Sequence, residues 1–271
     1  MTEGDEADGD YESGPRVKAV DTTFAIVKSL RTLDGGKVTE IVEETGLSKG
    51  AVYKHLSTLQ EHDFVVKDGS EYALGFRFLD YGGWLRSNYT GSGIIKPQIQ
   101  ELAEETNEVA MFAIQENARI VTLFRENGNQ GVFTRTRLGR RMYPSQTAGG
   151  KAILSQLPDE EVRSILDTTG LPKETENTIT DEAKLFEELE TVRERGYAFN
   201  REESTKGLVA VAVPLVPGDT VLGACSVAGP RHRMGDERLN EEIVDMLLSV
   251  VNELELNITH SQKSTDMFGS T

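Results

Sequence analysis

The sequence contains a single cysteine, Cys225, among 271 residues, and only four histidines. One thiol cannot form an internal disulfide, and the scattered histidines lack the spacing of zinc sites and of the H-E-x-x-H motif. Cys225 lies inside an apolar run, which predicts a buried structural thiol rather than a nucleophile. The composition therefore predicts no metal site, no cofactor and a reducing compartment.

Long apolar runs are also missing, since no stretch approaches the roughly eighteen apolar residues that a membrane-spanning helix needs. The first residues, TEGDEADGDYE, are acidic, which is the opposite of a secretory or transit signal. The segment GGKA at 149–152 lacks the upstream glycine and the following serine or threonine of a phosphate-binding loop. These absences predict a cytoplasmic protein that is neither membrane-bound nor an enzyme.

Positive charge is scarce, because 45 acidic residues face 29 basic ones and give a net charge of −16. The acids are unevenly distributed, however. Residues 1–14 hold six acids and no base, whereas residues 15–75 hold nine acids and eight bases. A nearly neutral segment in an acidic chain is compatible with DNA binding. The acid excess, with arginine more common than lysine, predicts adaptation to a salt-rich cytoplasm, and an acidic protein of an ordinary cytoplasm is the alternative.

The segment VTEIVEETGLSKGAVYKHLSTL, residues 38–59, has the pattern of a helix-turn-helix. Gly46 allows the positive φ of a short turn, Leu47 can fill the core between the helices, and Ser48 is placed as the N-cap of the second one. The apolar positions of the two helices follow helical spacing: Val38, Ile41 and Val42 in the first, and Val52, Leu56 and Leu59 in the second.

Flanking segments predict a winged version of this motif. An amphipathic helix that ends at Gly35-Gly36 precedes it, with Val20, Phe24, Val27 and Leu30 on one face. Two short strand-like runs surround Asp68-Gly69, which is a hairpin signal. We therefore expect a winged helix-turn-helix domain at 15–75, preceded by a disordered acidic tail at 1–14.

The helix that follows Ser48 leaves its polar side outward, and the N-terminal half of a recognition helix contacts bases and phosphates. Lysine can neutralise phosphate or donate to guanine, while tyrosine can bind phosphate or pack on a thymine methyl group. The predicted contacts to double-stranded DNA are Ser48, Lys49, Gly50, Tyr53, Lys54, Ser57 and, on the wing, Lys67. A winged helix that packs or docks another protein remains the alternative, with the lysines merely solvated.

After Gly75 the segment 76–88 predicts a helix with one aromatic and aliphatic face, and the glycines at 91 and 93 mark a domain boundary. Phe76, Phe78, Leu79, Trp84 and Leu85 form this face, which a second subunit is expected to cover. Beyond the boundary, helices are predicted at 95–106, 147–157, 159–168, 181–195 and 236–258, and strands at 109–115, 119–126, 197–202, 208–216 and 221–228. This mixture predicts a mixed α/β fold with an antiparallel sheet.

From about Val17 to Ile258 the chain resembles IclR-type transcriptional regulators, on an ordered set of segments: VDTTFAIVKSL, IVEETGLSKGAVYKHLSTL, YALGFRFLDYG, AGGKAILSQLP, ERGYAFNREES, GLVAVAVPLV and SVAGPRHRM. The resemblance implies a linker helix at 76–91 and a GAF-like effector-binding domain at 92–259, which leaves a flexible tail at 260–271. It also implies homodimers or homotetramers on pseudo-palindromic operators, commonly of catabolic genes. With the acid excess, it suggests a member from a halophilic archaeon.

The loop MYPSQTAGGKAIL, residues 142–154, is the candidate effector site. Thr147 can cap the helix that follows, and Ala148, Gly149 and Gly150 leave its first amides open to a carboxylate or phosphate. Glycines that merely allow close packing are the alternative. The resemblance implies that the amides of Ala148 and Gly149 hold a small organic acid or sugar-derived effector.

The resemblance also carries further pocket positions over to this chain: Met142, Asn200, Leu208, Ala210, Ser226 and Ala228. Family members that bind small keto acids tend to have aspartate at the position of Asn200, and a polar or sulfur side chain at that of Ala210. The two departures argue against a keto acid. Plain packing remains open for Met142 and Leu208, and so does a second domain that only oligomerises.

The segment Thr134-Arg135-Thr136-Arg137 and the pair Arg140-Arg141 make the most basic stretch of the second domain. This stretch could attract an anionic effector, or it could pair with neighbouring acids. We expect the pairing with acids.

Overall fold

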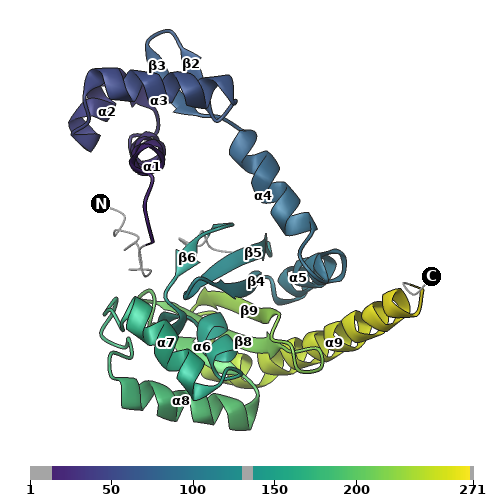
Figure 1. Ribbon diagram of the computed structural model, residues 1–271. Helices are drawn as coiled ribbons and strands as arrows, with labels where there is room; N and C mark the ends of the chain where they lie inside the picture. Colours follow the sequence, from purple (N-terminus) through teal and green to yellow (C-terminus); the bar gives the residue numbers. More distant parts are fainter. Residues whose placement is uncertain (1–13, 130–136, 269–271) are drawn as a thin grey trace. The chain divides into compact units, whose positions relative to one another are not determined.

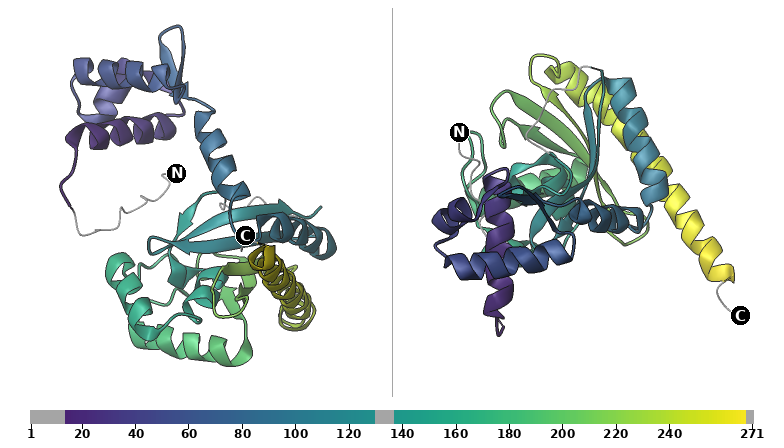
Figure 2. Two further views of the ribbon diagram at one scale, coloured as in Figure 1. Left: turned by 45° about the vertical axis from the view of Figure 1, so that its right-hand side comes forward. Right: turned by 90° about the horizontal axis from the view of Figure 1, so that it is seen from above.

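The computed structural model describes residues 14–129 and 137–268, and the chain divides into two compact units between Asn88 and Tyr89 (Figures 1 and 2). Apart from Gly14, the acidic tail predicted at 1–14 lies outside the described residues. The division falls three residues before the domain start expected from the sequence at 92.

The first unit is a three-helix core with a small sheet, as the sequence predicts. Its elements are α1 (Lys18–Thr32), β1 (Gly36–Lys37), α2 (Val38–Thr45), α3 (Lys49–Glu61), β2 (Val65–Asp68) and β3 (Glu71–Leu74), with the antiparallel strand order β1-β3-β2. Ile26, Leu30, Ile41, Val52, Leu56, Leu59, Val65 and Tyr72 form its core.

The packed face of α1 differs from the predicted one. Leu30 is buried and Val27 half-buried, whereas Val20 and Phe24 are exposed. Ile26 completes the packed face, because it lies one turn before Leu30 while Phe24 points about 200° away from Ile26 around the helix.

The helix α4 (Arg77–Ser87) follows β3 in the same unit and contains Gly82 and Gly83 in its interior. Two aromatic residues attach it to the core, since the Phe78 and Tyr81 rings lie 4.8 and 5.6 Å from the ring of Phe64. The rest of its apolar face is exposed: Phe76 just before it, Leu79, Trp84 and Leu85.

The second unit is built on an antiparallel sheet whose strand order is β6-β5-β4-β9-β8-β7. The strands are β4 (Val109–Glu116), β5 (Arg119–Asn127), β6 (Arg141–Met142), β7 (Ala198–Arg201), β8 (Leu208–Leu215) and β9 (Gly223–Pro230). All their pairings are antiparallel, which confirms the predicted fold class.

Helices cover both faces of this sheet (Figure 1). One face packs on α5 (Ser92–Thr106) and α9 (Ile243–Phe268), through a large aliphatic core. The other face packs on α6 (Ala148–Leu154), which α7 (Asp159–Thr169) and α8 (Glu182–Arg195) then cover through Leu154. The N-terminal end of α6 therefore lies against the second face of the sheet, where the effector site was predicted.

Two features of the second unit test predictions from the sequence. Cys225 is completely buried in β9, and burial raises the pKa of its thiol to about 12, as expected for a structural cysteine. Residues 260–268, which the sequence places in a flexible tail, continue α9. The reason is that neither glycine nor proline interrupts the helix before Gly269.

No helix in the described part of the chain is long and apolar enough to cross a membrane.

Candidate DNA-binding and effector-binding sites

The turn between α2 and α3 has the predicted geometry. Gly46 ends α2 with φ of 66°, and the Ser48 side chain caps α3 by accepting a hydrogen bond from the Ala51 amide at 3.2 Å. Leu47 packs against the core between the helices. The sequence Gly46–Gly50 also has the G-x-S-x-G spacing of a hydrolase nucleophile elbow. Here the motif joins two helices rather than a strand and a helix, and its serine serves as a cap.

The outward side of α3 carries the predicted contact residues. Val52, Leu56 and Leu59 are buried, and the side away from them exposes Lys49, Gly50, Tyr53, Lys54 and Ser57. Gly50, Lys54 and Ser57 follow one another at about one turn, so they share one exposed strip. No acidic residue lies in the first turn of α3, which leaves the positive end of the helix dipole uncompensated.

His55 and Lys67, two polar residues near the exposed side of α3, differ in what they contact. The ring of His55 bonds the Thr23 hydroxyl of α1 at 2.9 Å, so His55 ties α3 to the core and does not face outward. Lys67 is exposed on β2, one residue before the last strand position of the hairpin, and its ammonium lies 5.2 Å from the Tyr72 ring. The hairpin turns at Gly69-Ser70, one residue later than the sequence suggested, and Gly69 has φ of 56°.

In the second unit, a face of very small side chains meets α6. Ala113, Ala198, Ala210, Ala212, Ala224 and Ala228 of the sheet cluster with Ala148 and Ala152, and Met142 packs beside them. Ser226 lies on the same face, because it pairs with Ala212. Leu208 lies there too, because it is two positions before Ala210 on β8. The structure thus brings the predicted pocket residues together on one face.

The first turn of α6 packs closely against the segment that precedes it, at Gly150 but not at Gly149. A Cβ on Gly150 would lie 2.1 Å from the Pro144 carbonyl oxygen, so glycine is required there for close packing. A Cβ on Gly149 would make an ordinary contact of 3.9 Å with Ala224. The Thr147 side chain accepts from the Gly150 amide at 3.0 Å. The amides of Ala148 and Gly149 are then the ones at this end with no acceptor from the helix or its cap.

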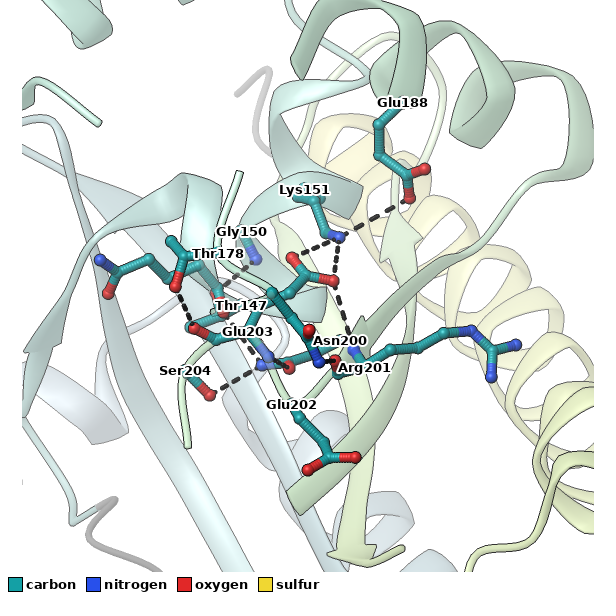
Figure 3. Close-up of polar contacts among 12 residues, drawn as sticks. Thr147, Gly150, Lys151, Thr178, Glu188, Asn200, Arg201, Glu202, Glu203 and Ser204 are labelled. Atoms are coloured by element: carbon teal, nitrogen blue, oxygen red, sulfur yellow. Dashed lines mark hydrogen bonds and ion pairs between the residues drawn. The ribbon is translucent and has the colours of Figure 1, made fainter. Parts of the chain in front are cut away.

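Asn200 has a different environment from the one that the sequence suggested. Its amide nitrogen donates to the Gln146 carbonyl at 2.9 Å and to the Ser204 hydroxyl at 2.8 Å (Figure 3). Its side-chain oxygen accepts from the Glu203 amide at 2.9 Å. Both N–H groups of the side chain and its oxygen are therefore engaged within the protein.

Sequence reasoning missed a buried ion pair beside this site. The Lys151 side chain is 1% exposed, and its ammonium donates to the two carboxylate oxygens of Glu203 at 2.8 and 2.7 Å. Glu188 of α8 lies 3.7 Å from the same ammonium. The only sign of this ion pair in the sequence is that Lys151 lies inside the apolar run AGGKAIL.

Thr122 was missed as well. It pairs with Ala113, so its side chain points to the face that meets α6. Its hydroxyl is buried and has no hydrogen-bond partner among the described residues. A buried hydroxyl without a partner is uncommon, which makes Thr122 a candidate ligand contact.

One arginine of the basic stretch, Arg141, pairs with an acid. Arg141 binds the Glu116 carboxylate at 2.7 Å and also donates to the Glu116 carbonyl at 2.7 Å. This agrees with the expected pairing with acids. Thr134, Arg135 and Thr136 lie outside the described residues.

A cavity of about 410 Å³ opens at the other end of α6, between Ile153, Leu157, Tyr89 and the turn that precedes Gly223. It does not include Ala148 or Gly149, which are buried. Among the described residues, the two α6 amides without an acceptor from the helix or its cap lie at the opposite, N-terminal end of the helix, so the cavity and the predicted effector site do not coincide.

Comparison with known proteins identifies the family of both units. The IclR helix-turn-helix domain matches residues 19–69, and the family described as bacterial transcriptional regulator IclR C-terminal matches residues 92–255. The probable HTH-type transcriptional regulator ArcR of Halobacterium salinarum is 26% identical over 249 residues, which cover 90% of this chain and 94% of the relative.

Solved structures show the same fold. The Thermotoga maritima IclR has a TM-score of 0.74 and 27% identity, with 89% of this chain and 97% of that chain covered. An IclR homolog from Microbacterium hydrocarbonoxydans, complexed with 4-hydroxybenzoate, has a TM-score of 0.75 at 16% identity and covers 90% and 100%. With both of its units matched in order, the chain belongs to the IclR family of DNA-binding transcriptional regulators with an effector-binding domain.

Proposed function

We propose that the protein binds a pseudo-palindromic operator in double-stranded DNA through α3 and the β2–β3 wing. The observation that carries this proposal is the exposed strip on α3, opposite a fully buried side. A helix with this profile fits the major groove, where side chains of its N-terminal half reach base edges. Lys67 on the wing is placed for a phosphate contact. A regulator of this kind would act in the cytoplasm, on genes such as catabolic operons.

The proposed effector is a small organic acid, which includes sugar-derived acids. Its carboxylate would accept hydrogen bonds from the amides of Ala148 and Gly149, with help from the positive end of α6. The hydroxyls of Ser226 and Thr122 would contact the remainder of the ligand from the sheet. The homologue that was crystallised with 4-hydroxybenzoate, itself a carboxylate, supports this ligand class.

We further propose that the operator is bound by two or more copies of the chain. Trp84 is 64% exposed on α4, and Leu79 and Leu85 of the same helix are exposed as well. Several large apolar side chains exposed on one short helix are typical of a protein–protein contact, and a pseudo-palindrome requires two recognition helices. A second copy of α4 is the partner that satisfies both conditions.

Footprinting on the DNA upstream of the protein's own gene tests the proposal. We expect two protected half-sites about one helical turn apart, and a change in protection when a matching acid is added. A folded double variant, Lys49→Ala with Lys54→Ala, should lose the footprint. If the wild-type protein protects no sequence over non-specific DNA, operator binding is refuted and the winged helix must dock another protein.

A second unit that only oligomerises is the competing function, and one observation favours it. The residues at the N-terminal end of α6 are buried, and the cavity described above lies at the opposite end. Thermal unfolding in the presence of a panel of organic acids separates the two functions, because only an effector-binding unit is stabilised by one of them.

A further inference from the structure

We infer that Asn200, Lys151 and Glu203 are positioning residues, which hold the first turn of α6 in the geometry that its amides need to bind the effector. The inference rests on the proposed effector site. The three residues belong to a hydrogen-bonded network that joins α6 to the loop after β7 (Figure 3).

Asn200 holds the approach to α6 from the sheet. It lies on β7 opposite Ala210, and its side chain donates to the carbonyl of Gln146, two residues before Ala148. The same side chain bonds the Glu203 amide and the Ser204 hydroxyl. The turn that precedes the two amides is thereby fixed to the loop that starts at the end of β7. Because all its polar groups are used, Asn200 acts on a ligand through the turn rather than by direct contact.

Lys151 and Glu203 join the same turn to the loop after β7 a second time. Lys151 lies three residues after Ala148, and its ammonium binds both carboxylate oxygens of Glu203. Glu203 is itself fixed at every polar group. Its carboxylate accepts from the Arg201 amide at 3.2 Å, and its carbonyl accepts from the hydroxyls of Thr178 at 2.7 Å and Thr175 at 3.2 Å.

The chemistry of this pair indicates more than a contribution to stability. A buried ion pair gains little over well-packed apolar side chains of the same volume, because both charges lose their hydration. Its directional bonds, however, fix the relative position of the two segments that they join. Amides that already point at the ligand lose little freedom on binding, and this lowers the cost of association.

The test replaces the pair by apolar side chains, in the variant Lys151→Met with Glu203→Leu, so that no buried charge remains. Its matched control is Lys206→Met with Glu176→Gln, which removes an exposed pair of the same unit at 3.1 Å. Asn200→Ala is the second test variant, since it removes the bonds to Gln146, Ser204 and the backbone amide of Glu203 while both side chains of the ion pair stay in place. Hydrogen exchange of the amides of residues 148–151 is measured in full-length protein without ligand, and 4-hydroxybenzoate and other small carboxylates serve as probes of binding.

We expect faster exchange at residues 148–151 in both test variants and unchanged exchange in the control. A carboxylate that binds the wild-type protein should bind each folded test variant on the order of tenfold to a hundredfold more weakly, by analogy with metal sites that lose the outer-shell partners of their ligating side chains. Wild-type exchange and affinity in a folded test variant would overturn the inference, and Asn200→Ala decides it if the double variant does not fold. If the wild-type protein binds no carboxylate, the effector proposal fails, while the exchange rates still decide whether the network holds the turn.

Discussion

Lys54→Ala separates two ways in which α3 can contact DNA. If Lys54 donates to a guanine, its loss costs about 1–3 kcal/mol per half-site at every salt concentration, and base preference relaxes at one position. If it meets a phosphate, the slope of log K against log salt falls by about 0.9 per contact. Two copies on one operator then lose about 1.8 in slope, so that the affinity deficit changes roughly tenfold between 50 and 200 mM salt.

The assay is a salt titration of operator affinity by fluorescence anisotropy, with wild-type protein and Lys54→Ala in parallel. Lys184→Ala is the matched control, because it makes the same charge change on an exposed position of α8 in the other unit. Equal affinities of wild-type protein and Lys54→Ala at all salt concentrations, with intact folding, would remove Lys54 from the interface and refute the assignment of the exposed strip.

Four further predictions follow from the same features. The acid excess predicts a shallower salt slope for specific binding than the exposed bases suggest, and binding that disappears at moderate salt would contradict adaptation to high salt. The exposed face of α4 predicts a dimer or larger assembly at micromolar concentration; sedimentation should show Trp84→Glu shifted toward monomer, and a monomeric wild-type protein would contradict this. Gly149→Val should abolish stabilisation by the effector acid, because a β-branched side chain beside Ala224 would fill the approach to the two amides; stabilisation that persists in a folded variant would place the pocket elsewhere. Burial raises the pKa of Cys225 to about 12, so the folded protein should resist thiol reagents up to at least pH 9, and the stability tied to the neutral thiol is lost only as pH rises further.

The elements of the fold could be predicted because their signals are local. Helical spacing at Val52, Leu56 and Leu59 needs only the sequence to predict the buried side of α3, and Gly46 and Ser48 specify the turn and the cap through their own chemistry. Errors arose where the signal was ambiguous. The apolar residues of α1 cover more than one face, so spacing alone could not distinguish exposed Phe24 from buried Ile26.

The candidate effector site was only partly predictable, because its groups come from segments distant in the sequence. Lys151 and Glu203 are separated by 52 residues, and each resembles an ordinary surface charge until the fold brings the two together. The same holds for Glu108, a buried carboxylate bonded by Arg233 from 125 residues away at 2.8 and 2.6 Å. A charge in an apolar run is a signal that something must pair with it, but it does not name the partner.

A ligand at the N-terminal end of α6 can change DNA affinity only if it favours one arrangement of the DNA-binding units over another. Within the second unit, α6 lies near the residues that directly follow α4. The far end of α6 borders the same cavity as Tyr89, the first residue of the second unit, and the Tyr89 hydroxyl donates to the carbonyl of Leu222. Burial raises the pKa of Tyr89 to about 12, so this donor keeps its proton throughout the physiological range. We propose that a shift of α6 on ligand binding reaches the linker region through the residues around this cavity, so that Tyr89→Phe, which removes the bond to Leu222, should weaken the effect of an acid on operator affinity while leaving binding of the acid unchanged.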